Sequence, residues 1–229
     1  MKIIKPPDLP AEPAHLEALG TMYPSELVLR RGPCTVELRD VDSTVYGCVL
    51  DGVAALDYLG HPMALAKDFY FAVPGRADLE IGPSTVVGLV RRAGYLGQFT
   101  VGKVEDRGRL RYVDGCSASI LVHPPRRGDP VLHHVHFPEG IEQAQGAHPL
   151  ICLGMVLRGR GEAFGPKCGP MNAPTEWWTE ALEPGCAFLL HEQEMHGFRT
   201  NPHHKGSSMD VVAFHPASNW GPRDAKEDR

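Results

Sequence analysis

Hydrophobic and polar positions alternate in short runs along most of the chain, and Gly or Pro interrupts nearly every run. Runs of this kind, rich in Val, Leu, Phe and Tyr and bounded by turn residues, predict β-strands. We expect strands at residues 44–50, 68–73, 85–90, 119–123, 131–137, 150–157, 186–190 and 209–214. Many short strands at such spacing predict an all-β, closed or double-sheet antiparallel architecture.

One segment near the start of the chain departs from this pattern. Leu16 and Leu19 are three residues apart and follow a Pro-rich stretch, a spacing that places both side chains on one face of a helix. The sequence therefore predicts a short N-terminal helix over residues 11–19.

The two halves of the chain share a plan, which indicates an internal duplication. In each half an apolar strand runs into a Gly-bearing hairpin, and a Pro-Gly turn follows about 25 residues later; these are residues 45–52 and 73–75, then 153–161 and 183–185. A chain of 229 residues is long enough for two such units, each with its own core. We accordingly predict two domains, residues 1–104 and 105–229.

Composition and charge exclude several classes of partner. The formal net charge is −5, and the basic residues are scattered, so no basic stripe is present to bind a nucleic acid backbone. The N-terminus lacks an apolar signal core, and no stretch approaches the roughly 18 apolar residues that a membrane-spanning helix requires. We expect a cytoplasmic protein without nucleic acid or membrane partners.

The six cysteines are widely and irregularly spaced, and no C-x-x-C pair occurs. This spacing favours neither a zinc knuckle nor a compact disulfide framework, so we expect reduced, buried thiols. Cys152 lies in an apolar run, and no neighbouring motif marks it as an activated nucleophile.

The C-terminal half contains an ordered set of motifs. His148-Pro149 precedes the hairpin V-L-R-G-R-G at residues 156–161, and Pro184-Gly185 precedes His196-Gly197-Phe198. In this order the motifs resemble the two conserved motifs of the cupin superfamily. The resemblance implies two cupin-like double-stranded β-helix (jelly-roll) barrels. The first is degenerate, because residues 67–75, where its second motif would fall, contain no histidine.

The resemblance also implies a metal site inside the second barrel. His148 and His196 match two of the family's ligands, but Gly146 stands where the first histidine of the first motif is expected. Among nearby residues we favour His136 and Gln143 to complete the set. Residues two apart on a strand face the same way, so such side chains can converge on one ion, and imidazole ligands suit a divalent metal such as Zn or Fe.

A competing register remains open. His134-Val135-His136 is itself an H-x-H, with Glu139 three residues later, and both registers retain His196. A single histidine is more often a structural or surface residue than a ligand. For His148 and His196, which lie in matching motifs, we favour a ligand or pocket role.

Further phrases, at residues 108–116, 128–130, 136–138 and 214–222, resemble the cupin modules of hydrazine-forming enzymes, which occur beside synthetase-like modules. This resemblance implies a metal-dependent enzyme of specialised metabolism that acts on a small polar metabolite and forms an N–N bond. It also implies a separate or fused synthetase-like partner. Two alternatives stay open, a non-heme iron dioxygenase and a non-catalytic small-molecule-binding cupin. We expect a homodimer, with the N-terminal barrel in a structural or dimer-forming role.

Overall fold

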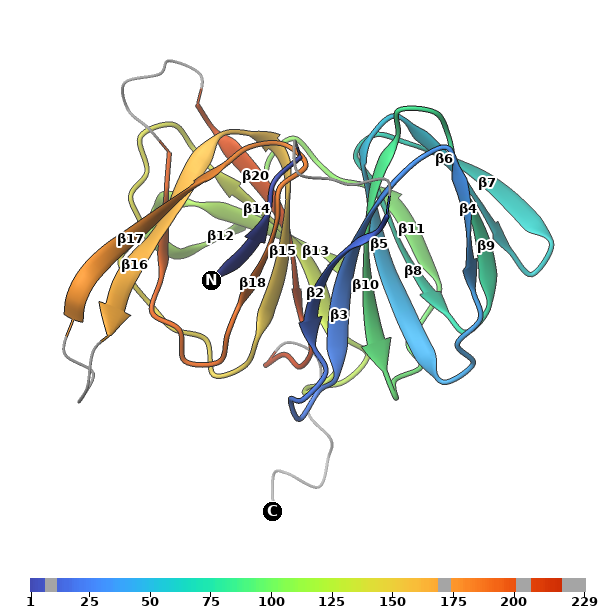
Figure 1. The fold of residues 1–229 in the computed structure, drawn as a ribbon, viewed down its shortest axis with the longest axis horizontal. Helices are drawn as coiled ribbons and strands as arrows, with labels where there is room; N and C mark the ends of the chain where they lie inside the picture. Colours follow the sequence, from blue (N-terminus) through green and yellow to red (C-terminus); the bar gives the residue numbers. More distant parts are fainter. Residues whose placement is uncertain (7–11, 169–173, 201–206, 220–229) are drawn as a thin grey trace.

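The computed structural model describes residues 1–6, 12–168, 174–200 and 207–219. Figure 1 shows two β-barrels side by side, one built mainly from the first half of the chain and one from the second. The all-β class predicted from the sequence is confirmed. The described residues include no helix with the length and apolar character needed to cross a bilayer.

The N-terminal barrel consists of a six-stranded and a four-stranded antiparallel sheet. In spatial order the larger sheet contains β11 (Thr100–Lys103), β8 (Phe69–Pro74), β5 (Ser43–Asp51), β10 (Val86–Ala93), β3 (Ser25–Arg31) and β2 (Ala14–Ala18). The smaller sheet contains β4 (Cys34–Leu38), β9 (Ala77–Ile81), β6 (Val53–Tyr58) and β7 (His61–Ala66).

The C-terminal barrel has a seven-stranded and a three-stranded antiparallel sheet. The larger sheet contains β1 (Lys2–Ile4), β18 (Ala187–Leu190), β15 (Cys152–Gly159), β20 (Met209–His215), β14 (Val131–Phe137), β13 (Ser117–Val122) and β12 (Leu110–Arg111). The smaller sheet contains β17 (Pro174–Leu182), β16 (Gly161–Cys168) and β19 (Gly197–Arg199). A 3-10 turn, Val113–Gly115, follows β12.

Strand order shows the duplication directly. The run β8-β5-β10-β3-β2 in the first barrel corresponds to β18-β15-β20-β14-β13 in the second. Gly47 in β5 and Gly154 in β15 occupy matching places, and each lies beneath a phenylalanine ring from the neighbouring strand. The shared plan that the sequence indicated is therefore a shared topology.

The first strand of the chain links the two barrels. β1 precedes the N-terminal barrel in the chain but pairs with β18 of the C-terminal barrel, whereas β11 pairs with β8 of its own barrel. One edge of the C-terminal sheet is thus extended by a segment from the other half of the chain. The division into residues 1–104 and 105–229 as units of folding stays a prediction, and β1 adds to the sheet of the second unit.

The predicted N-terminal helix is wrong for the described residues. Residues 14–18 form β2, which pairs along β3 from Ala14 opposite Leu29 to Ala18 opposite Ser25. Leu16 and Ala18 are buried, while Leu19 is 46% exposed, so the burial period is two and not three to four. The available edge of β3 outweighed the weak helical spacing, because pairing there buries Leu16 against the core.

The largest sheets of the two barrels pack back to back. Leu27, Tyr46 and Val90 from the first barrel share one buried cluster with Leu132, Met155, Val212 and Phe214 from the second. The rings of Tyr46 and Phe214 meet across this interface with centroids 4.9 Å apart. One face of each sheet is therefore covered by the other barrel, and the opposite face lines the interior of its own barrel.

A buried apolar cluster fills the interior of the N-terminal barrel. It includes Val45, Leu56, Phe71 and Leu79, each less than 7% exposed. This packing agrees with the interpretation of the first barrel as a structural copy.

We predict that Gly47→Ala destabilises the protein although Gly→Ala in a strand would ordinarily help. An added Cβ would lie 2.0 Å from the ring of Phe71, which is fully buried and cannot move aside. Overpacking of this kind costs about 1–3 kcal/mol. Urea unfolding measures the change. The control is Gly20→Ala, where a Cβ meets open space and the change should stay within about 0.5 kcal/mol; equal stability of the two variants would contradict the prediction.

Candidate functional site

The C-terminal barrel encloses a pocket with a volume of ≈ 390 Å³. Its walls are largely apolar. They are formed by strands β14, β18, β19 and β20 and by the loop before β15. The apolar lining consists of Val135, Phe137, Phe188, Leu190, Phe198, Val211 and Ala213. The polar groups are concentrated in a few side chains, as is usual for small-molecule sites.

Four of these polar side chains are histidines. His133 lies on β14, His215 on β20, His148 in the loop before β15, and His196 directly before β19. Their rings form a row in which His133 and His215 have centroids 5.1 Å apart, His215 and His148 4.9 Å, and His148 and His196 5.0 Å. The row brings together segments that are up to 82 residues apart in the chain.

Strand alternation explains why two of these rings face the pocket. On β14 the side chains of His133, Val135 and Phe137 share one face, and all three line the pocket. On β20 the pocket-facing set is Val211, Ala213 and His215. Residues two apart on a strand point the same way, so each histidine continues an apolar stripe.

Burial holds these imidazoles in their neutral form. Desolvation lowers the pKa of His133, His148 and His196 to about 4. Repulsion adds to the effect, from His148 and His134 at His133, from His196 at His148, and from the N-terminal ammonium at His196. The pKa of His215 is lowered well below its ordinary value by the same causes. Four uncharged rings at neutral pH can therefore accept hydrogen bonds or bind a cation with nitrogen lone pairs.

The tautomer of His196 is fixed by its surroundings. Its Nδ1 lies 2.7 Å from the carbonyl oxygen of Glu194, an atom that can only accept a hydrogen bond. The proton of the neutral ring must therefore be on Nδ1, which leaves Nε2 as an acceptor.

Cys152 also lines the pocket, but it is a thiol and not a thiolate. Burial raises its pKa to about 12. Because the thiolate is the nucleophile and the metal ligand, this side chain behaves as a small apolar wall at neutral pH.

Three of the four predicted site residues meet in this pocket. His148, His196 and Gln143 all line it, and Gln143 additionally donates from Nε2 to Sγ of Cys116 at 3.6 Å. His136 does not join them. Its place on β14 is out of phase with His133, so its side chain is on the face that points away from the pocket.

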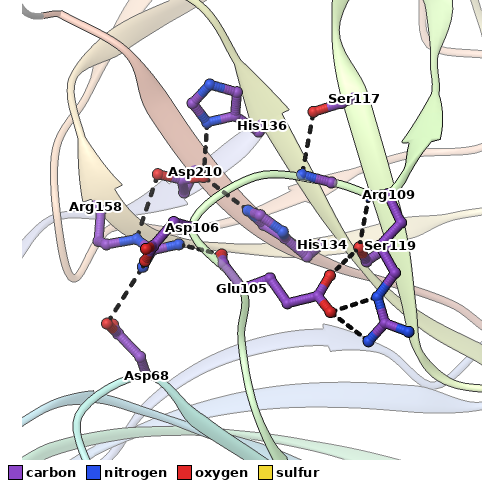
Figure 2. Close-up of polar contacts among 11 residues, drawn as sticks. Asp68, Glu105, Asp106, Arg109, Ser117, Ser119, His134, His136, Arg158 and Asp210 are labelled. Atoms are coloured by element: carbon purple, nitrogen blue, oxygen red, sulfur yellow. Dashed lines mark hydrogen bonds and ion pairs between the residues drawn. The ribbon is translucent and has the colours of Figure 1, made fainter.

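His136 belongs instead to a polar network between the barrels, drawn in Figure 2. Nε2 of His134 and Nδ1 of His136 lie 2.7 and 3.0 Å from the same oxygen of Asp210, Oδ1. The two histidines of the alternative H-x-H therefore do point to the same face of β14, but that face is directed toward Asp210 and not toward the pocket. Arg158 pairs with Oδ2 of Asp210 at 3.3 Å and with Asp68 of the N-terminal barrel at 3.4 Å. This network holds the two barrels together.

Sequence reasoning missed His133 and His215. The available signal was the phase of β14, where His133 alternates with Val135 and Phe137, but the neighbouring H-x-H at residues 134–136 drew attention to the opposite face. His215 ends β20 with no motif around it that indicates a ligand. Its role follows from pairing of β20 between β14 and β15.

The donor chemistry of the pocket suits the metal that the family resemblance implies, but its geometry does not complete a site. Zn–N bonds of about 2.0–2.1 Å place the centroids of two adjacent imidazole ligands about 5 Å apart, which the neighbouring rings match. However, in the described part of the chain no three His, Cys, Asp or Glu side chains of the pocket bring ligand atoms within 4.8 Å of one another. These residues do not form a closed three-ligand set.

Such a set does occur elsewhere among the described residues. His15 and Glu17 of β2 and Glu26 of β3 offer ligand atoms within 4.8 Å of one another on the outside of the N-terminal barrel. His15 and Glu17 are exposed, and Nδ1 of His15 pairs with Glu26 at 3.8 Å. Exposed acidic groups often cluster in this way without an ion, so we assign no function to the group.

We predict that stability decreases as the pH falls from about 6.5 to about 4. Unfolded histidines bind protons near pH 6.5, whereas His133, His148 and His196 resist protonation down to about pH 4 in the folded state. The unfolded state therefore takes up more protons across this window, which lowers the free energy of unfolding. Urea unfolding between pH 7 and pH 4.5 measures the slope. His215→Gln should reduce it, and His61→Gln, at an exposed position, should not.

Comparison with known proteins supports the fold. No family model matches the sequence, and no curated protein matches it. Solved structures, in contrast, do match this chain. The cupin 2 conserved barrel domain protein from Leptotrichia buccalis is 12% identical, with 93% of this chain and 95% of that chain covered and a TM-score of 0.64.

Two further structures agree. Protein Ylba from E. coli is 11% identical over 97% of this chain and 92% of its own, with a TM-score of 0.67. AerE from Microcystis aeruginosa is 11% identical over 88% and 96%, with a TM-score of 0.56. At these identities the likeness concerns the fold and not the activity. The motif order, the duplicated strand order and these structures together show that the chain has the cupin fold, present twice.

Proposed function

We propose that the C-terminal barrel is the functional half of this protein and that it binds one small metabolite of mixed apolar and polar character. The observation that supports this most is the convergence of four neutral imidazoles from four separate segments on one cavity. Neutral imidazoles that line a cavity can each donate one hydrogen bond and accept another, so the row offers several polar contacts to one ligand.

The size and lining of the cavity fit such a ligand. A volume of ≈ 390 Å³ lies within the range of about 300–1,000 Å³ typical of small-molecule sites. Phe137, Phe188 and Phe198 provide apolar contact surface, and Gln143 and Tyr112 add polar groups at the wall.

The contrast between the two barrels supports the same division of labour. In the N-terminal barrel the buried ring of Phe71 belongs to the cluster that fills the interior. In the C-terminal barrel its counterpart, Phe188, is also buried in a cluster but lines the cavity as well. The row of histidines at this cavity has no counterpart in the buried cluster that fills the N-terminal barrel.

The low pKa values of the pocket imidazoles favour a role in binding over a role in acid–base catalysis. An effective general base has a pKa near the working pH, whereas His133, His148 and His196 have pKa values of about 4. Neutral rings with such values serve better as hydrogen-bond partners or as ligands to a cation.

The second candidate is the metal-dependent enzyme implied by the family resemblance. The observation in its favour is the 5.0 Å spacing of the His148 and His196 rings, which suits two imidazoles on one ion. His215, 4.9 Å from His148, and Gln143 are available to add a third contact after side-chain movement. The reactions that the resemblance implies, N–N bond formation or oxygen activation on a small polar metabolite, belong to this candidate.

We predict that small neutral aromatic molecules bind in the C-terminal pocket. On protein labelled with 15N-histidine, they should shift the side-chain signals of His133, His148, His196 and His215, which line the pocket, and leave that of the exposed His61 unchanged. His148→Ala should weaken the binding and the matched variant His61→Ala should not. Binding that leaves all four pocket signals unmoved, or no binding by any compound of a fragment set, would contradict the proposed function.

For the metal candidate we predict that added Zn²⁺ stabilises the wild type through the pocket. At about ten times its Kd, a ligand stabilises the folded state by about 1.4 kcal/mol, which corresponds to a rise in Tm of roughly 3–6 °C. His148→Ala and His196→Ala should abolish the rise, and a chelator should reverse it in the wild type. His15→Ala controls for the exposed cluster on β2 and β3. A rise that persists in both pocket variants would exclude this candidate.

A further inference from the structure

Gly146 and His196 lie directly opposite each other at the mouth of the pocket. The amide of Gly146 donates to the carbonyl of His196 at 2.9 Å, and the amide of His196 donates back to the carbonyl of Gly146 at 2.9 Å. In an antiparallel pair of this kind both side chains point to the same face. A side chain at position 146 would therefore stand beside the ring of His196.

Glycine leaves that position open. A Cβ built on Gly146 meets no atom within 4 Å, and the backbone φ is not in the left-handed region. Gly146 itself lines the pocket and is exposed at its mouth. The fold thus leaves open space at position 146, on the side where its side chain would stand beside His196.

The polar groups around this space favour a hydrogen-bond donor over an anion. Nε2 of His196 is an acceptor, because the ring proton is on Nδ1. Among the described residues that line the pocket there is no Lys or Arg, and Asp114 is the one side chain with a formal charge. A carboxylate or phosphate placed here would meet a lone pair and a negative charge, and the N-terminal ammonium, the cation that acts on His196, is already paired with Glu194.

We propose that the space beside Gly146 is a subsite for the hydrogen-bond-donating head group, N–H or O–H, of a neutral or cationic ligand. The donor faces Nε2 of His196, and the apolar remainder of the ligand packs against Phe137 and Phe198 deeper in the pocket. This inference rests on the proposed function and narrows it to one chemical class. Metabolites whose recognition depends on a carboxylate in the pocket are excluded.

Three probes of nearly equal shape separate the contributions, namely benzyl alcohol, toluene and benzoate. One neutral hydrogen bond contributes roughly 0.5–1.5 kcal/mol, so benzyl alcohol should bind roughly three- to tenfold more tightly than toluene. Benzoate should bind more weakly than toluene, because its charge is desolvated without a partner. Calorimetric titration of the wild type gives the three affinities.

Variants at position 146 test whether the tighter binding of benzyl alcohol depends on the space beside His196. Gly146→Leu fills the space and should reduce the affinity for benzyl alcohol to that for toluene, with Gly146→Ala as an intermediate. The matched control is Gly20→Leu, which also adds a side chain to open space but lies outside the pocket. Circular dichroism and Tm confirm that each variant is folded.

A second readout in the wild type does not depend on any variant. Benzyl alcohol should shift the 15N signal of His196 Nε2, and toluene should shift it less. Equal affinity for all three probes, preferred binding of benzoate, or an unmoved Nε2 signal would overturn the subsite while leaving a pocket that binds toluene. Absence of binding by every probe would instead contradict the proposed function itself.

Discussion

The back-to-back packing of the two large sheets is the constraint on which the rest of the structure depends. It buries Tyr46 against Phe214 and places Leu132 and Val212 in a core shared by both barrels. Once one face of β14 and β20 is covered in this way, strand alternation assigns every second residue to the barrel interior. The positions of the pocket side chains on β14 and β20 follow from this assignment.

The same packing explains the polar network at the interface. His134 and His136 emerge on the covered side, where an unpaired polar group is costly. Asp210 contacts both rings and Arg158, and Arg158 reaches Asp68 in the other barrel. The network therefore pairs Nε2 of His134 and Nδ1 of His136 with Asp210 and links the two barrels through Arg158, while His133 and His215 face the cavity.

The two barrels share one topology but differ in the side chains of their interiors. The strand orders of the barrels match, so the backbone frame is common to both. Large apolar side chains fill the interior of the N-terminal barrel. The interior of the C-terminal barrel is lined by apolar side chains and by a row of imidazoles with low pKa values.

The sequence by itself determined the all-β class, the duplicated plan and the pairing of His148 with His196, because turn residues, strand periodicity and short motifs are local signals. Gln143 followed from its place near those motifs. Only the tertiary structure decided that residues 14–18 are a strand, that β1 joins the sheet of the C-terminal barrel, and that His133 and His215, not His136, line the pocket. Each of these depends on which strand edge is available and which sheet face is covered, and both are set by contacts between residues far apart in the chain.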